Sequence, residues 1–222
     1  TTTAKALHTW SRRGFISSCS ACAACMAFTP VGLVATSCKS SGTAKKLRIR
    51  ILYSLHAVVQ PGPDWPNVGF DFGPPMEKIN STLSSAFRDM EFIPSLATGP
   101  EDAAKIVEDD KLNPVDGYIV YQMNCWNRVI QTIASTGKPV IYADFQFGGS
   151  GGFLVYNASL LNAGKRNVGF VASSSMDDLI AAVSCFRITG KGGTTDEFVA
   201  ATDNARIKAT RGSGKYSIKP ND

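Results

Sequence analysis

Five short apolar segments, separated by stretches that have helical spacing, constrain the fold of this chain more than any other feature. The apolar segments cover residues 47–53, 91–94, 117–121, 139–143 and 168–171. Short apolar runs bounded by turn residues are typical of buried strands, and helices between successive strands favour parallel pairing. The sequence therefore predicts an α/β fold, with a doubly wound, mostly parallel five-stranded sheet of the Rossmann or flavodoxin type and helices on both faces.

Several of the expected helices have recognisable first residues. Pro100 begins a helix whose first turn carries Glu101 and Asp102, where acidic side chains face the positive end of the helix dipole. Ser175 is a typical N-terminal cap for the helix that follows it. The other expected helices, together with the one that Ser175 caps, cover residues 76–87, 126–135, 153–162, 176–186 and 196–211.

The composition divides the chain into four parts. We assign residues 1–38 to an export signal, 39–46 to a flexible polar tether, 47–187 to the α/β domain, and 188–222 to a linker and C-terminal helix that would lead to a missing domain. Because the chain begins with Thr1 rather than Met, we expect it to be a fragment of a longer protein.

The first part contains a motif that resembles a twin-arginine export signal. Arg12 and Arg13 follow Ser11 and precede Phe15 and Ile16, and a weakly apolar stretch then runs on toward residue 33. A positive segment, an apolar segment and small residues near a cleavage point together indicate export. The twin-arginine translocase is therefore an expected partner, and the expected location is the periplasm or the envelope membrane.

Residues 33–38 resemble a bacterial lipobox in which Cys38 is the lipidated residue. A single acyl chain binds membranes only marginally, so stable anchoring would need a multiply acylated cysteine. A lipoprotein and a soluble exported protein both remain open. Cys19, Cys22 and Cys25 have the spacing of an iron–sulfur run, but they lie inside the signal, where cysteine serves as a small apolar residue.

The distribution of charge argues against nucleic-acid binding. The net charge of +5 includes +3 from residues 1–38, which hold three basic and no acidic residues. The remainder has 20 basic against 18 acidic residues and is nearly neutral. Phosphate binding needs clustered Lys and Arg, so we expect no nucleic-acid partner.

Polar and aromatic residues gather where the predicted strands end. In doubly wound sheets, ligands bind outside the carboxyl ends of the strands. Amides and carboxylates bind hydroxyl groups there, and aromatic faces bind C–H surfaces, so these residues predict a site for a sugar or polyol. The candidate ligand-binding residues are Asp64, Trp65, Asn67, Asn124, Trp126, Asp144, Gln146 and Ser173.

Known catalytic motifs are absent or lack their partners. Gly148–Gly152 matches the Gly-x-Ser-x-Gly nucleophile elbow, but Ser150 lies several residues beyond the predicted strand, and the only histidines, His8 and His56, precede it. A glycine-rich approach to a helix N-terminus and a plain flexible loop are the alternative interpretations, and both remain open. The sequence has no dinucleotide fingerprint, no phosphate-binding P-loop and no cluster of His and acidic residues for a metal.

The stretch from Val115 to Tyr121, followed by a helix and by the run from Gly137 to Ile141, resembles the N-terminal region of the L-fucose/L-arabinose isomerase family. The resemblance covers about residues 47–187. It implies a Rossmann-like N-terminal domain that contributes to a sugar pocket, and it leaves a homo-oligomer open. It also implies a divalent metal, typically Mn²⁺, whose ligands belong to later domains, so no catalytic or metal residue is assigned in this chain.

Two functions from different classes follow. The first is the N-terminal domain of an exported sugar-isomerase-like protein, non-catalytic by itself. The second is an envelope-tethered binding module for a sugar or a small polar ligand.

Overall fold

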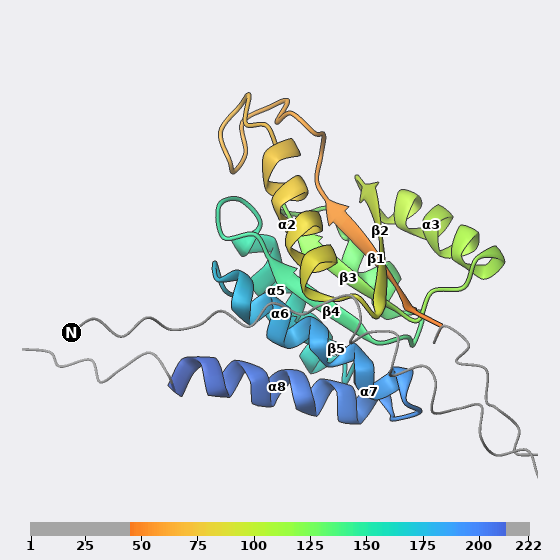
Figure 1. The fold of residues 1–222 in the computed structure, drawn as a ribbon. Coiled ribbons are helices and arrows are strands. Elements are labelled where there is room, and N and C mark those ends of the chain that lie inside the picture. Colours follow the sequence, from red (N-terminus) through yellow and green to blue (C-terminus); the bar gives the residue numbers. More distant parts are fainter. Residues whose placement is uncertain (1–44, 212–222) are drawn as a thin grey trace, which may run out of the picture. The chain divides into compact units, whose positions relative to one another are not determined.

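The computed structural model describes residues 45–211, so the expected export signal with Arg12, Arg13 and Cys38 lies outside the described residues. Five parallel strands form one sheet in the order β2-β1-β3-β4-β5 (Figure 1). This is the flavodoxin-like order of doubly wound sheets, and the fold class expected from the sequence is confirmed. The strands are β1 (Leu47–Ser54), β2 (Met90–Ala97), β3 (Gly117–Gln122), β4 (Val140–Asp144) and β5 (Val168–Val171).

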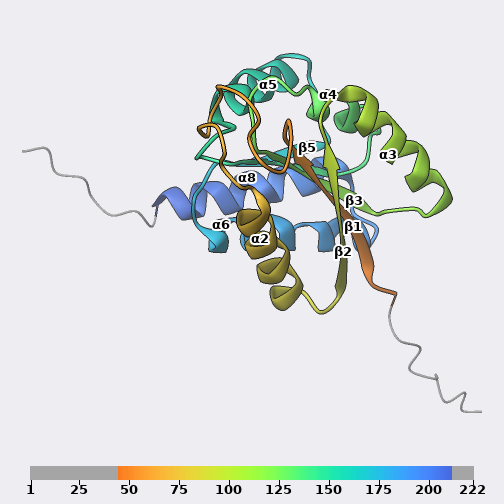
Figure 2. The same cartoon turned by 90° about the horizontal axis from the view of Figure 1, so that it is seen from above.

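Helices cover both faces of the sheet, as Figure 2 shows from above. The chain moves one way from β1 to β2 and the opposite way from β2 through β5, and right-handed crossovers then place the connecting helices on opposite faces. One face carries α2 (Gly73–Ala86), α6 (Met176–Ser184), α7 (Phe186–Gly190) and α8 (Thr195–Arg211). The other carries α3 (Pro100–Leu112), α4 (Val129–Ala134) and α5 (Ser150–Asn162).

The alternation of side chains along each strand builds two separate apolar cores. In β3, Ile119 and Tyr121 pack under α2 and α6, whereas Tyr118 and Val120 pack under α3 and α4. All four side chains are buried, as expected for a central parallel strand covered on both faces. The two cores fix the register of the sheet and thereby the positions of the residues at its carboxyl edge.

Helix α8 belongs to the same unit as the sheet. Phe198 of α8 is fully buried and stacks on Phe186, with 5.0 Å between ring centres. Thr202 packs so closely on Gly169 of β5 that a side chain at residue 169 would overlap it. The α/β unit therefore includes α8, which lies beyond the expected domain end at residue 187, and the Gly/Thr-rich run at 188–195 connects α8 to α7.

Three helix starts differ by three residues from those that the sequence predicts, and one of them is that of α5, which begins at Ser150 rather than at Phe153. Helix α4 begins at Val129 rather than at Trp126, because Trp126 and Arg128 have positive φ angles of 65° and 57°. Helix α2 begins earlier, at Gly73, because Pro74 and Pro75 occupy its first turn, where a missing amide hydrogen costs nothing. The cap at Ser175 is confirmed: its Oγ accepts a hydrogen bond of 3.2 Å from the Asp177 amide.

The two edge strands of the sheet, β2 and β5, differ in what limits further pairing at their free edges. Pro94 lies within β2, opposite Ile51, and it is compatible with that strand because β2 is at the edge. At the other margin, α8 contacts β5 through Thr202 on Gly169 and through Arg206, whose guanidinium lies 3.9 Å from the centre of the Phe170 ring. Successive strand residues point to opposite faces, so α8 reaches around the free edge of β5.

A candidate ligand cavity at the carboxyl edge of the sheet

A cavity of about 400 Å³ lies where β3 and β4 end, between the first turns of α2 and α6. We call it the main cavity. It is at the edge of the sheet where ligands bind in doubly wound folds, and its volume lies within the usual range for small-molecule sites. Its walls are formed by Phe70, Pro74, Pro75, Lys78, Ile79, Tyr121, Asp144, Phe145, Gln146, Phe147, Ser173, Ser174 and Met176.

Aromatic side chains form much of the apolar wall. Phe145 lies 6.3 Å from Phe70 and 5.4 Å from Phe147, measured between ring centres, and all three line the main cavity. Phe147 is 68 % exposed, so its ring is open to a molecule that approaches from solvent. Flat ring faces of this kind pack against the C–H surfaces of a ligand.

Asp144, the last residue of β4, is the buried acid of the main cavity and is only 6 % exposed. Both of its carboxylate oxygens lie 3.0 Å from the hydroxyl of Ser150, the first residue of α5. No ion pair involves Asp144 within residues 45–211. Burial raises the pKa of the Asp144 carboxyl, and the hydrogen bond from Ser150 offsets part of that rise.

The glycine-rich segment before α5 allows Ser150 to reach Asp144. A side chain at Gly149 would overlap the backbone carbonyl oxygen of Gln122, so only glycine lets the start of α5 approach the end of β3 so closely. The Ser150 hydroxyl is paired with Asp144, whereas His56, the only histidine of the described part, has its Nε2 3.1 Å from Asp64. The segment therefore positions a serine beside an acid at a helix N-terminus.

Tyr121 of β3 lines the main cavity. The hydroxyl makes no hydrogen bond to another described residue, although the ring stacks on Tyr53 with 6.2 Å between centres. Burial, with a smaller contribution from the charge of Asp144, raises the pKa of Tyr121 to about 12. At neutral pH the Tyr121 hydroxyl is thus protonated and can donate a hydrogen bond, and both Tyr121 and Asp144 line the main cavity.

Asn124 is fully buried and anchors the β1–α2 loop, residues 55–72. Its Oδ1 accepts a hydrogen bond of 2.9 Å from the His56 amide, and its Nδ2 donates to the Trp65 carbonyl at 2.8 Å and to Gln60 Oε1 at 3.1 Å. Both polar atoms are used inside the protein, and Asn124 does not line the main cavity. The structure therefore gives this candidate ligand-binding residue a loop-anchoring role.

Three of the eight candidate residues, Asp144, Gln146 and Ser173, line the main cavity together. Asp64, Trp65 and Asn67 lie together in a separate, open hollow of the β1–α2 loop. Trp126 packs edge-on against Tyr156, 6.1 Å between ring centres, and lines neither of these spaces. The structure therefore does not bring all eight residues into one cavity: the β1–α2 loop meets the end of β3 through its backbone at Trp65, and its side chains at 64, 65 and 67 line a hollow of their own.

Sequence reasoning missed several residues of the main cavity. Tyr121, Phe145 and Phe147 flank the ends of predicted strands, and their aromatic character was an available signal. Lys78 lies within α2, and no local motif marks it as a wall residue.

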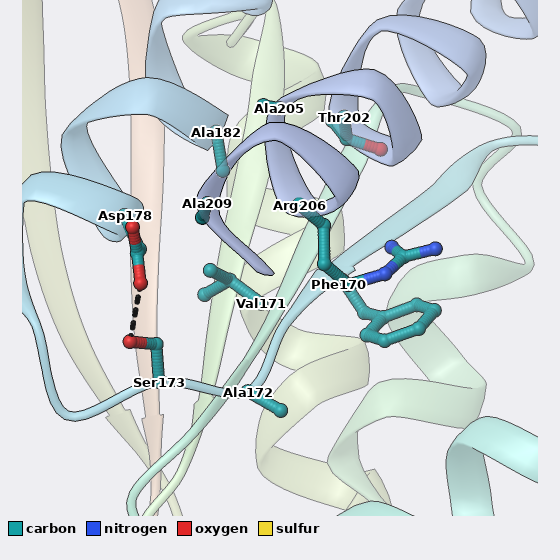
Figure 3. A pocket seen from close by; sticks show the side chains of 10 residues that line it. All are labelled: Phe170, Val171, Ala172, Ser173, Asp178, Ala182, Thr202, Ala205, Arg206 and Ala209. Carbon is teal, nitrogen blue, oxygen red and sulfur yellow. Dashed lines mark hydrogen bonds between the residues drawn. The ribbon is translucent and has the colours of Figure 1, made fainter. Parts of the chain in front are cut away.

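A second, smaller cavity of about 160 Å³ lies beside the end of β5, between α6 and α8 (Figure 3). Ser173 lines both cavities. Its hydroxyl donates a hydrogen bond of 2.6 Å to Asp178, visible in Figure 3, and accepts one from the Ser175 amide. These bonds fix Ser173 at the boundary between the two cavities.

No group of three or more His, Cys, Asp or Glu side chains that could hold a metal ion is found among residues 45–211. Helices long and apolar enough to cross a membrane are also missing from this part of the chain.

Comparison with known proteins gives little further information. No family model matches the chain, and no curated protein matches it. The chain is similar to a solved structure, the transcription regulator CcpA of Lactococcus lactis, with 10% sequence identity and a TM-score of 0.33. The match covers 75% of this chain and 74% of that chain. Similarity at this level does not indicate a function.

Proposed function

We propose that this chain is a binding module for a sugar or a comparable polyol, which it holds in the main cavity. The observation that carries the proposal is the environment of Asp144. A buried carboxylate with one serine donor retains acceptor capacity for further hydroxyl groups, and the aromatic wall beside it suits the C–H surface of a sugar. Tyr121 and Gln146 supply additional hydrogen-bonding groups at the same wall.

The location and the parent protein are proposals of the same kind. The leader motif with Arg12 and Arg13 supports export, and Cys38 supports attachment to the envelope membrane. Trp65, on the β1–α2 loop, is 73 % exposed, and Phe147, between β4 and α5, is also largely exposed. A further domain that packs on this apolar surface would bury both rings. This supports the alternative that the module is the N-terminal domain of an exported sugar-isomerase-like protein, with Mn²⁺ ligands contributed by residues outside 45–211.

Isothermal titration calorimetry of the full 222-residue chain tests the binding proposal. The panel contains aldopentoses, aldohexoses, alditols and sugar acids. We expect at least one member to bind, and Asp144→Asn to weaken that binding about tenfold or more, because an amide has only one acceptor oxygen. Asp109→Asn, which changes an exposed carboxylate on α3, is the matched control. Absence of binding across the panel, or equal binding by Asp144→Asn, would contradict the proposal.

A further inference from the structure

The main cavity has two charged side chains, and they come from different elements. Asp144 ends β4, and Lys78 lies in the second turn of α2. Neither forms an ion pair with the other or with any other side chain in residues 45–211. Lys78 is exposed at the rim of the main cavity and Asp144 is buried in its wall, so the cavity has an unpaired cation at its rim and a buried anion inside.

The surroundings of Lys78 favour an anionic partner. Pro74, Pro75, Ile79 and Met176 line the same wall, and a bound molecule would displace water from between them. Because Lys78 is exposed, a neutral ligand leaves its ammonium group in water and gains nothing from the charge. A carboxylate would instead form a charge-assisted hydrogen bond, which strengthens as the local dielectric falls.

Asp144, the other charged side chain of the main cavity, disfavours an anionic ligand group beside it. A ligand carboxylate beside Asp144 would be repelled, whereas hydroxyl groups can donate to both of its oxygens. We propose that the ligand is a polyhydroxylated carboxylate, a sugar acid, whose carboxylate pairs with Lys78 while its hydroxyl groups bind Asp144. This inference rests on the proposed function and specifies the ligand class for the same cavity.

A matched pair of ligands isolates the role of charge. D-Gluconate and D-glucitol have the same carbon chain and differ at one end, where a carboxylate replaces a hydroxymethyl group. In calorimetric titrations of the full chain, gluconate is expected to bind roughly 2- to 5-fold more tightly than glucitol, the range typical of an ion pair at an exposed lysine. The preference is expected to weaken as salt concentration rises.

Variants at residue 78 assign the preference to one side chain. Lys78→Met keeps the apolar stem and is expected to make gluconate bind about as weakly as glucitol, whereas Lys78→Arg is expected to retain most of the preference. Lys208→Met, at an exposed lysine of α8, changes the net charge equally and is expected to have no effect. Circular dichroism confirms that each variant is folded.

The possible outcomes distinguish failure of the sugar-acid inference from failure of the polyol-binding proposal on which it rests. Equal affinity for gluconate and glucitol, with both lost in Asp144→Asn, overturns the sugar-acid inference and leaves the polyol-binding proposal standing. A gluconate preference that persists in Lys78→Met overturns the assignment to Lys78. Binding of glycine or serine in place of every polyol overturns both, because an ammonium group would then occupy the position at Asp144.

Discussion

The hydroxyl of Ser150 lies 3.0 Å from each carboxylate oxygen of Asp144, so the first residue of α5 is the hydrogen-bond donor to the buried acid of the main cavity. The arrangement joins the end of β4 to the helix that follows it. It also leaves a buried carboxylate that no described cation neutralises.

Replacing Asp144 with Asn is expected to raise the stability of the free protein at neutral pH, by roughly 1 kcal/mol. Burial raises the pKa of Asp144 in the folded state, so its contribution to stability is fully present at acid pH and is lost as pH rises through the folded pKa. The advantage of Asp144→Asn should therefore shrink as pH falls from 7 toward about 4. Thermal unfolding across that range measures it, with Asp109→Asn as the control. A stability difference that does not change with pH would contradict this account.

Replacing Asn124 with Ala is expected to destabilise the protein by about 2–4 kcal/mol. The substitution leaves the His56 amide, the Trp65 carbonyl and the Gln60 side chain without their buried partner. Urea unfolding gives the free-energy change, and hydrogen exchange at the His56 amide should accelerate. Asn67→Ala, on the exposed part of the same loop, should change the free energy of unfolding by less than about 0.5 kcal/mol. Equal effects of the two substitutions would show that Asn124 is not the anchor.

Replacing Gly149 with Ala is expected to cost about 3 kcal/mol of stability, because the new methyl group overlaps the Gln122 carbonyl. Gly151→Ala is the matched control. Its methyl group would lie 3.3 Å from Cys125 Sγ, a contact that a small shift relieves, and alanine favours the helix. Denaturant unfolding should rank wild type and Gly151→Ala close together and Gly149→Ala well below them. The reverse order would mean that α5 does not start where we describe it.

Replacing Phe147 with Ala is expected to weaken binding about 5- to 30-fold without lowering the melting temperature. The ring lines the main cavity but is largely exposed, so its removal leaves little void in the folded protein. Calorimetry and thermal unfolding on the same samples test both halves of the expectation. Trp65→Ala removes an exposed ring from the separate loop hollow, and unchanged affinity is expected there. Loss of binding in both variants would move the site toward the β1–α2 loop.

The sheet was predictable because its signals are local. The buried run at β3 and the cap at Ser175 depend on neighbouring residues, and both appear in the structure where the sequence places them. The helix start at Trp126 was not predictable, since a positive φ angle at a tryptophan has no signature in helical spacing. The role of Asn124 as a loop anchor was not predictable either, because it depends on how the 18-residue loop 55–72 folds back onto the end of β3. That is a tertiary contact between residues far apart in sequence.

The same distinction applies to the main cavity. Asp144 and Gln146 directly follow the core of a predicted strand, so their approach to the carboxyl edge follows from strand direction. Lys78 reaches the cavity only because α2 packs beside α6 on one face of the sheet. That packing follows from the strand order, which the periodicity of the sequence does not specify.

The two margins of the sheet have a consequence for assembly. Pro94 interrupts the row of amide donors along β2, and α8 reaches around β5, so neither margin of the described sheet offers a continuous template for strand addition. Copies of this domain therefore cannot readily pair through backbone hydrogen bonds between their edge strands. This lowers the tendency of the five-stranded parallel sheet to aggregate into fibres. Any oligomer formed through residues 45–211 would then be held by side chains of helices and loops, and its geometry would be set by packing instead of by backbone hydrogen bonds.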